Sequence, residues 1–149
     1  MPEDAPKKCE FVVRDLIIKV DMTLAGDVKA IDPAVEKIMN TVGEMSCGEG
    51  KEFEIELSIR EALANAIVHG CREDRELSVR ISVGCDEQRG MIIVVKDSGS
   101  GFDPATLPNP VVGENIYSEH GRGIYLINRL MDEVRFREKG TEIWMRKSR

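Results

Sequence analysis

The sequence Glu61-Ala-Leu-Ala-Asn-Ala-Ile-Val-His-Gly70 is the most informative stretch of this chain of 149 residues. Ala, Leu and Glu have a high helix propensity and glycine commonly ends a helix, so the stretch predicts the last turns of a helix that stops at Gly70. Apolar and polar residues alternate just before it, as in a strand, but no turn residue intervenes. We therefore expect one helix over residues 52–69, with Glu61 and Asn65 on one face because they are four positions apart.

Two elements are expected before this helix and two directly after it. Residues 11–20 are rich in β-branched residues and predict a strand. Asp32-Pro33 predicts a helix start with aspartate as the N-cap, and the helical spacing of apolar residues that follows ends at Gly43. Alternating residues predict a strand over 79–83, the apolar run 91–95 predicts a second strand, and the short segment between them predicts a hairpin loop.

The C-terminal part of the chain predicts a long loop, a helix and two strands. Residues 102–120 contain three prolines and no clear period, which is typical of a functional loop. A helix is expected to start right after Gly123, and alternating residues predict strands around 134–136 and 143–145. Because tight turns join most strands, we predict an α+β two-layer sandwich with a mainly antiparallel mixed sheet, covered on one face by helices.

Length and composition indicate one compact domain, which we place over residues 11–149 after a flexible leader of residues 1–10. The formal net charge of −6 argues against nonspecific binding of nucleic acid, and the basic residues 146–149 are expected to be a solvated end. No apolar run approaches the length of a membrane span, and the leader lacks the apolar core of a signal peptide. We therefore expect a cytoplasmic protein without membrane contact.

The four cysteines are irregularly spaced and form no C-x-x-C pair, so a structural zinc site has little support. We expect reduced thiols, as is usual in the cytosol, and leave a disulfide open.

Glu61 and Asn65 provide a carboxylate and a carboxamide on one helix face. Magnesium prefers oxygen ligands, and the neutral amide oxygen of Asn65 suits a metal that already carries phosphate charge. A glutamate one turn away can accept a proton from a hydroxyl or water beside the phosphates. Taken alone, this spacing is more often an ordinary solvated helix face.

Two glycine-rich turns follow this helix. Asp97 precedes Gly99 and Gly101 at the end of an apolar strand, where its carboxylate can accept a hydrogen bond from an exocyclic amine and the glycines let a flat ring approach. Gly121-Arg122-Gly123 opens a helix, and backbone N–H groups at a helix start bind anions such as phosphates. The plainer alternatives are a common strand turn and a loop–helix junction. His69 is expected to be structural.

Together these stretches resemble the GHKL ATPase family and, within it, the anti-sigma-factor serine/threonine kinase branch (RsbW-like proteins). The stretch 61–70 is similar to the N-box of that branch, Asp97-Ser-Gly99-Ser-Gly101 to its adenine-binding box, and Gly121-Arg122-Gly123 to the glycine box after its ATP lid. Gly140-Thr141 resembles the last conserved element. The resemblance implies a Bergerat-type ATP-binding fold that takes ATP or ADP with Mg²⁺.

The resemblance also implies roles for individual residues. Glu61 would be the general base, Asn65 would hold Mg²⁺, and Asp97 would bind the adenine amine with help from Thr141. The glycines named above and Arg122 would contact the nucleotide, and residues 102–120 would close over it. In this family the phosphorylated partner is a STAS-domain anti-anti-sigma protein, the second partner is a sigma factor, and homodimers are common.

Two other functional classes stay open at this level. One is a nucleotide-binding interaction module with little or no kinase turnover, because residues 33–45 lack the arginine that this branch often uses to contact a sigma factor. The other is an α+β domain that uses none of these motifs, which requires four coincidences in the right order.

Overall fold

The structure, a computed structural model, describes residues 17–86, 88–99 and 119–149, with the side chains of 119–122 excepted. It contains one antiparallel sheet of five strands in the order β1-β2-β3-β5-β4. The strands are β1 (Ile17–Ala25), β2 (Ser78–Asp86), β3 (Gly90–Asp97), β4 (Glu133–Arg137) and β5 (Glu142–Lys147). The expected loop over 102–120 lies mostly outside the described residues.

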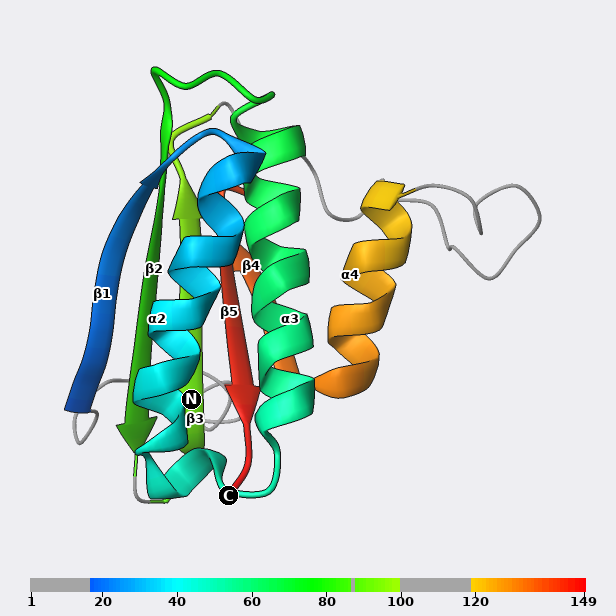
Figure 1. Ribbon diagram of the computed structural model, residues 1–149. Coiled ribbons are helices and arrows are strands. Elements are labelled where there is room, and N and C mark those ends of the chain that lie inside the picture. Colours follow the sequence, from blue (N-terminus) through cyan, green and yellow to red (C-terminus); the bar gives the residue numbers. More distant parts are fainter. Residues whose placement is uncertain (1–16, 87, 100–118) are drawn as a thin grey trace.

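Three helices lie side by side on one face of this sheet, and the opposite face carries none among the described residues (Figure 1). They are α2 (Ile31–Gly43), α3 (Glu52–Asn65) and α4 (Glu119–Leu130). Three short helical segments accompany them: η1 (Val28–Ala30), η2 (Ser46–Gly48) and η3 (Ala66–Gly70). This arrangement confirms the predicted α+β two-layer fold. No helix of the described part is long and apolar enough to cross a membrane.

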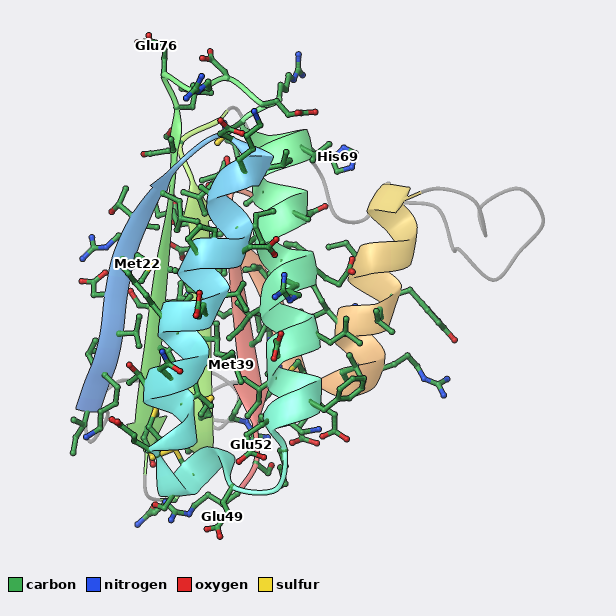
Figure 2. The ribbon with its side chains drawn as sticks, viewed as in Figure 1. Met22, Met39, Glu49, Glu52, His69 and Glu76 are labelled. Carbon is green, nitrogen blue, oxygen red and sulfur yellow. A yellow bond between two sulfur atoms is a disulfide. The ribbon has the colours of Figure 1, made fainter. Side chains whose placement is uncertain are left out.

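The core lies between the sheet and the three helices. Val79, Ile81 and Val83 alternate along β2 and are fully buried, so this strand presents one apolar face to the helices, as its sequence predicts. Met22 of β1 and Met39 of α2 are partly buried where that strand and helix meet (Figure 2). Burial of this apolar surface is the main force that holds the helices on the sheet.

The expectation of one continuous helix from residue 52 is confirmed, although its pitch changes near the end. Ile55, Ile59 and Leu63 recur at helical spacing and are fully buried, whereas Phe53 is 75% exposed. The alternation in the sequence is therefore incidental. From Ala66 the helix widens into the π-helical turn η3, in which the Cys71 N–H donates to the Ala66 carbonyl at 2.8 Å. Such turns are frequent at functional sites.

Two expected helix starts are wrong. Asp32 is not an N-cap, because α2 begins at Ile31. The capping aspartate is Asp27, whose side chain accepts from the Lys29 N–H at the start of η1, while Asp32 forms an ion pair with Arg60 of α3 at 2.6 Å. Likewise, α4 begins at Glu119 rather than after Gly123, so both glycines of the predicted turn lie inside the helix.

The expected strand over 11–20 is confirmed from Ile17 and extends to Ala25, and its first residues lie outside the described part. The expected strands over 79–83 and 91–95 are confirmed as a hairpin of β2 and β3, and those around 134–136 and 143–145 as β4 and β5.

The C-terminal residues are anchored, contrary to the expected solvated end. Lys147 donates to the Leu130 carbonyl at 2.5 Å, and the Ser148 N–H donates to Asp132 Oδ2 at 2.7 Å. The reduced state expected for the cysteines is also corrected for one pair, since Cys47 and Cys85 form a disulfide. Cys71 is free and buried, while Cys9 lies outside the described residues.

Candidate functional site

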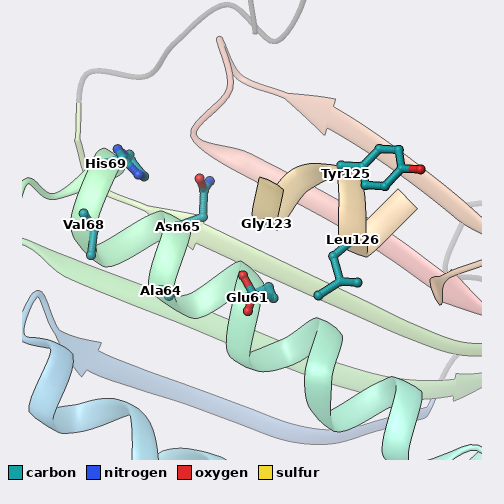
Figure 3. Close-up of a pocket in the computed structure, with 8 residues that line it drawn as sticks. All are labelled: Glu61, Ala64, Asn65, Val68, His69, Gly123, Tyr125 and Leu126. Atoms are coloured by element: carbon teal, nitrogen blue, oxygen red, sulfur yellow. The ribbon is translucent and has the colours of Figure 1, made fainter. Parts of the chain in front are cut away.

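A cavity of about 500 Å³ lies between the C-terminal half of α3 with η3 on one side and α4 on the other (Figure 3). This volume falls within the range of roughly 300–1,000 Å³ that small-molecule sites occupy. Its polar wall consists of Glu61, Asn65 and His69, which follow one another at four-residue intervals along a single helix face. Gly123, Tyr125 and Leu126 of α4 line the opposite wall.

Asn65 is the last residue of α3 and carries a buried side-chain oxygen without a hydrogen-bond partner among the described residues. A buried acceptor left unsatisfied costs about 1–3 kcal/mol. Asn65 lies on the cavity wall, so a cation bound in the cavity could be coordinated by the lone pairs of this oxygen and offset that cost. The residue and its environment therefore fit a Mg²⁺ ligand, which matches the donor type that this ion prefers.

Glu61 lies one turn before Asn65 and packs against the backbone of α4. A Cβ atom added at Gly123 would be only 2.8 Å from Glu61 Oε1. The absence of a side chain at Gly123 thus lets the carboxylate lie against the first turns of α4. A side chain at this position would require the Glu61 carboxylate to shift, so glycine here preserves the position of Glu61 although it lowers helix stability.

Asp97 ends β3 and is only 7% exposed. Burial raises the pKa of its carboxyl above the ordinary value, while the hydrogen bond that the Gly99 N–H donates at 2.8 Å opposes that shift. The carboxylate does not line the cavity itself. It lies in close contact with Gly70, the residue after His69. A Cβ added at Gly70 would be 2.4 Å from Asp97 Oδ2.

Gly70 and Gly99 are both required by close contacts around this carboxylate. A Cβ added at Gly99 would lie 1.9 Å from the Gly70 carbonyl oxygen. The structure therefore brings together two glycines, Gly70 of the helix end and Gly99 of the following turn, that are far apart in sequence. Side chains at either position would push Asp97 away from the end of η3.

Thr141 is the backbone neighbour of Asp97. Its carbonyl accepts from the Asp97 N–H at 2.8 Å, and its hydroxyl donates to the Glu138 carbonyl at 2.8 Å. The hydroxyl oxygen keeps its acceptor capacity. Gly101 lies outside the described residues. Gly121 and Arg122 are placed by their backbone in the first turn of α4, and their side chains are not described.

Part of the cavity wall consists of residues that the sequence did not identify as site residues. His69, expected to be structural, lies at its edge beside the end of η3 (Figures 2 and 3). Its spacing of four from Asn65 already placed it on the functional face. Tyr125 and Leu126 had no such signal, because they follow the glycines inside a helix whose start was misplaced.

Comparison with known families gives a direct result. The model of the histidine kinase-like ATPase domain matches residues 24–147. The chain belongs to this family. The ATPase match runs from the end of β1 to the last residue of β5, so it includes both walls of the cavity and the Asp97 turn.

Individual relatives of this ATPase domain are protein kinases and an anti-sigma factor. Serine-protein kinase RsbW of Bacillus subtilis (strain 168) is 36% identical over 91 residues, which are 55% of this chain and 54% of the relative. The Bacillus licheniformis protein of the same name is 33% identical over 104 residues, 63% and 62% of the two chains. The anti-sigma F factor of Priestia megaterium is 25% identical over 132 residues, 85% and 80% of the two chains. The match thus spans a little over half of each kinase.

Proposed function

We propose that this protein is an ATP-dependent protein serine/threonine kinase that acts as an anti-sigma, partner-switching regulator. The observation that carries the proposal is the pairing of Glu61 with Asn65 on one wall of the cavity. The Glu61 carboxylate can accept a proton, and one turn away Asn65 presents a buried oxygen that has no hydrogen-bond partner among the described residues. The names of the relatives, serine-protein kinase and anti-sigma factor, support the same reading.

The nucleotide would run along α3 from Gly70 toward Glu61. Asp97 would accept from the adenine amine, with Thr141 assisting through its hydroxyl oxygen. Asn65 would hold Mg²⁺, which supplies charge neutralisation of the phosphates when bound. Gly99 and Gly101 would let the ring approach, and the phosphates would lie at the start of α4. The residues proposed there are Gly121, Arg122 and Gly123.

Glu61 performs the chemical step in this proposal. Its carboxylate accepts the proton of a serine or threonine hydroxyl on the acceptor protein. The hydroxyl oxygen forms a bond to the γ-phosphorus of ATP, the bond from that phosphorus to the bridging oxygen breaks, and ADP leaves with the bridging oxygen. Positioning by the helix face of Glu61 and Asn65 brings the acceptor and the phosphoryl group together, which is the main contribution an enzyme makes to phosphoryl transfer.

The partners of this activity would be two proteins. A STAS-domain anti-anti-sigma protein would be the phosphorylation substrate, and a sigma factor would be the protein that is bound and released. We further propose a cytoplasmic homodimer that contacts neither nucleic acid nor membrane directly. The net charge of −6 supports the exclusion of nonspecific nucleic-acid binding.

Incubation with labelled ATP and candidate STAS-domain proteins of the same organism tests the proposal. Wild-type protein should transfer label to a serine or threonine of the STAS protein. Glu61→Gln should reduce transfer by about 10²–10⁴-fold, the usual contribution of a general base, while the affinity for Mg-ATP stays within about threefold. Transfer that survives in Glu61→Gln would remove this residue as the base.

A binding module with little turnover is the second candidate. The observation in its favour is that Lys37 is the only basic residue of α2, so an arginine contact to a sigma factor has no counterpart on this helix. This function predicts that Mg-ATP and ADP bind without any label reaching the STAS protein. Labelled STAS protein in the experiment above would exclude it.

A further inference from the structure

One part of the cavity has no role in the proposed nucleotide site. Helix α4 runs antiparallel to α3, and Gly123 meets α3 at Glu61 (Figure 1). Residues after Gly123 therefore lie progressively farther from Asn65 and from the Asp97 turn. Tyr125 and Leu126 line the cavity at this end. Leu126 lies beside Glu61 on the side away from Asn65, and the ring of Tyr125 projects from α4 away from α3 (Figure 3).

Tyr125 connects this end of the cavity to an exposed positive charge. Arg129 follows it by one turn of α4, with its guanidinium carbon 5.8 Å from the centre of the tyrosine ring. Its Nη1 donates a hydrogen bond to the Tyr125 hydroxyl at 3.4 Å. The ring and this hydrogen bond hold the guanidinium against Tyr125, one helical turn beyond the residues that line the cavity, and the cation–π contact adds to the attraction.

The positive charge of Arg129 is not neutralised within the part of the chain that the structure describes, where it forms no ion pair with a carboxylate. The acidic residues that follow α4 are engaged elsewhere. Asp132 accepts from the Ser148 N–H, and Glu133 pairs with Arg146 at 2.9 Å. A guanidinium has five donors in a planar fork that matches a carboxylate, and contacts among the described residues use one of them, in the bond to Tyr125.

We propose that Tyr125 and Arg129 form the acceptor-binding end of the site and select a protein segment that carries a carboxylate side chain close to its phosphorylated hydroxyl. This inference rests on the proposed kinase function. The acceptor hydroxyl must reach Glu61 from the side opposite the nucleotide, and that side is the one that Tyr125 and Leu126 line. Charge complementarity with Arg129 then favours an acidic residue, and Leu126 provides an apolar contact for the segment.

The test uses the full-length protein, Mg-ATP and the same STAS-domain acceptor, with initial rates measured over a range of acceptor concentrations. Arg129→Glu should raise the KM for the acceptor about tenfold or more, as for the loss of about 1.4 kcal/mol of binding. The kcat at saturating acceptor and the Kd for Mg-ATP should stay unchanged. Tyr125→Phe, which keeps the ring but removes the hydrogen bond to Arg129, should raise the same KM by a smaller factor, and Arg129→Lys should lie between wild type and Arg129→Glu.

Lys19→Glu is the matched control, because Lys19 is exposed on the edge strand β1, away from the cavity, and its variant makes the same change in net charge. It should leave the acceptor KM unchanged. In a second experiment, acidic residues near the acceptor's phosphorylated hydroxyl are changed to lysine one at a time. One of these acceptor variants should be phosphorylated better by the Arg129→Glu kinase than by the wild-type kinase.

The outcomes separate this inference from the function on which it rests. An unchanged acceptor KM in Arg129→Glu, or an equal rise in Lys19→Glu, overturns the inference while kinase activity stands. Weaker Mg-ATP binding in Arg129→Glu also overturns it, because Arg129 would then belong to the nucleotide site. Absence of transfer by the wild-type protein, with Mg-ATP bound, overturns the kinase function and this inference together.

Discussion

At the scale of single residues, Asp97 combines a proposed binding role with a cost to stability. Burial raises the pKa of its carboxyl above the ordinary 3.8, so the folded state disfavours the charged form. The protonated carboxyl is preferred in the folded state, so it contributes stability that is fully present below the pKa of the unfolded chain. This contribution is lost as pH rises through the higher pKa of the folded state. Asp97→Asn cannot ionise. Its free energy of unfolding should therefore rise relative to wild type as pH increases from about 3.8, and then level off.

Urea unfolding of both proteins at a series of pH values, followed by Mg-ATP titration at pH 7, checks this prediction. The variant should bind Mg-ATP more weakly although it is at least as stable, because the new amide group presents a donor to the donor amine of adenine. Parallel stability curves at all pH values would contradict the raised pKa of Asp97.

The residues of the site were only partly predictable from the sequence. The four-residue spacing of Glu61 and Asn65 placed both on one face because helical geometry is local. The contacts of Gly70 with Asp97 and of Gly123 with Glu61 were not predictable, since they join segments that only the tertiary fold brings together. The same holds for Tyr125 and Arg129, whose place depends on how α4 packs beside α3.

At the scale of elements, α4 contains a conflict between helix propensity and site geometry. Glycine is less favourable than alanine inside a helix by about 1 kcal/mol, so Gly123→Ala should stabilise α4 by up to that amount. The new methyl group would lie 2.8 Å from Glu61 Oε1, at the flexible end of a side chain that can move away. Thermal unfolding should show equal or higher stability, whereas phosphoryl transfer should fall at least tenfold. Unchanged transfer would mean that the position of Glu61 is not critical.

The order of elements followed from the sequence, but two boundaries did not. Propensity placed the start of α4 after its glycines, whereas the helix begins at Glu119. Asp32-Pro33 has the residues of a helix start, yet Asp27 takes the capping role one short helix earlier. Local preferences of about 1 kcal/mol are too small to fix such boundaries.

At the scale of the whole molecule, the C-terminal strand ties the far ends of α3 and α4 together. Lys147 of β5 is only 12% exposed and pairs with Glu54 of α3, in addition to its bond with Leu130 of α4. Lys147→Ala should lower the free energy of unfolding by roughly 1.5–3 kcal/mol, the usual contribution of a hydrogen bond to a charged group. Mg-ATP affinity should not change, because Asn65 lies at the other end of α3.

Chemical denaturation measures this effect, with Lys19→Ala as an exposed control. The free energy of unfolding of the control should stay within about 0.5 kcal/mol of the wild-type value. A Lys147→Ala protein as stable as the control would show that the C-terminal anchor contributes nothing. The sequence could not predict the anchor, since a basic tail has the composition of a solvated end and its partners lie on elements distant in sequence.

Calorimetric titration of Mg-ATP into wild type and Asn65→Ala tests most directly whether the cavity between α3 and α4 binds Mg-ATP through Asn65. We expect saturable binding by the wild-type protein. The variant should lose about 1.4 kcal/mol or more of binding free energy, which raises its Kd at least tenfold. The variant should keep its fold, because the substitution removes a buried oxygen that has no hydrogen-bond partner in the described part of the chain. Equal affinity in both proteins, or no binding by folded wild-type protein, would contradict the account.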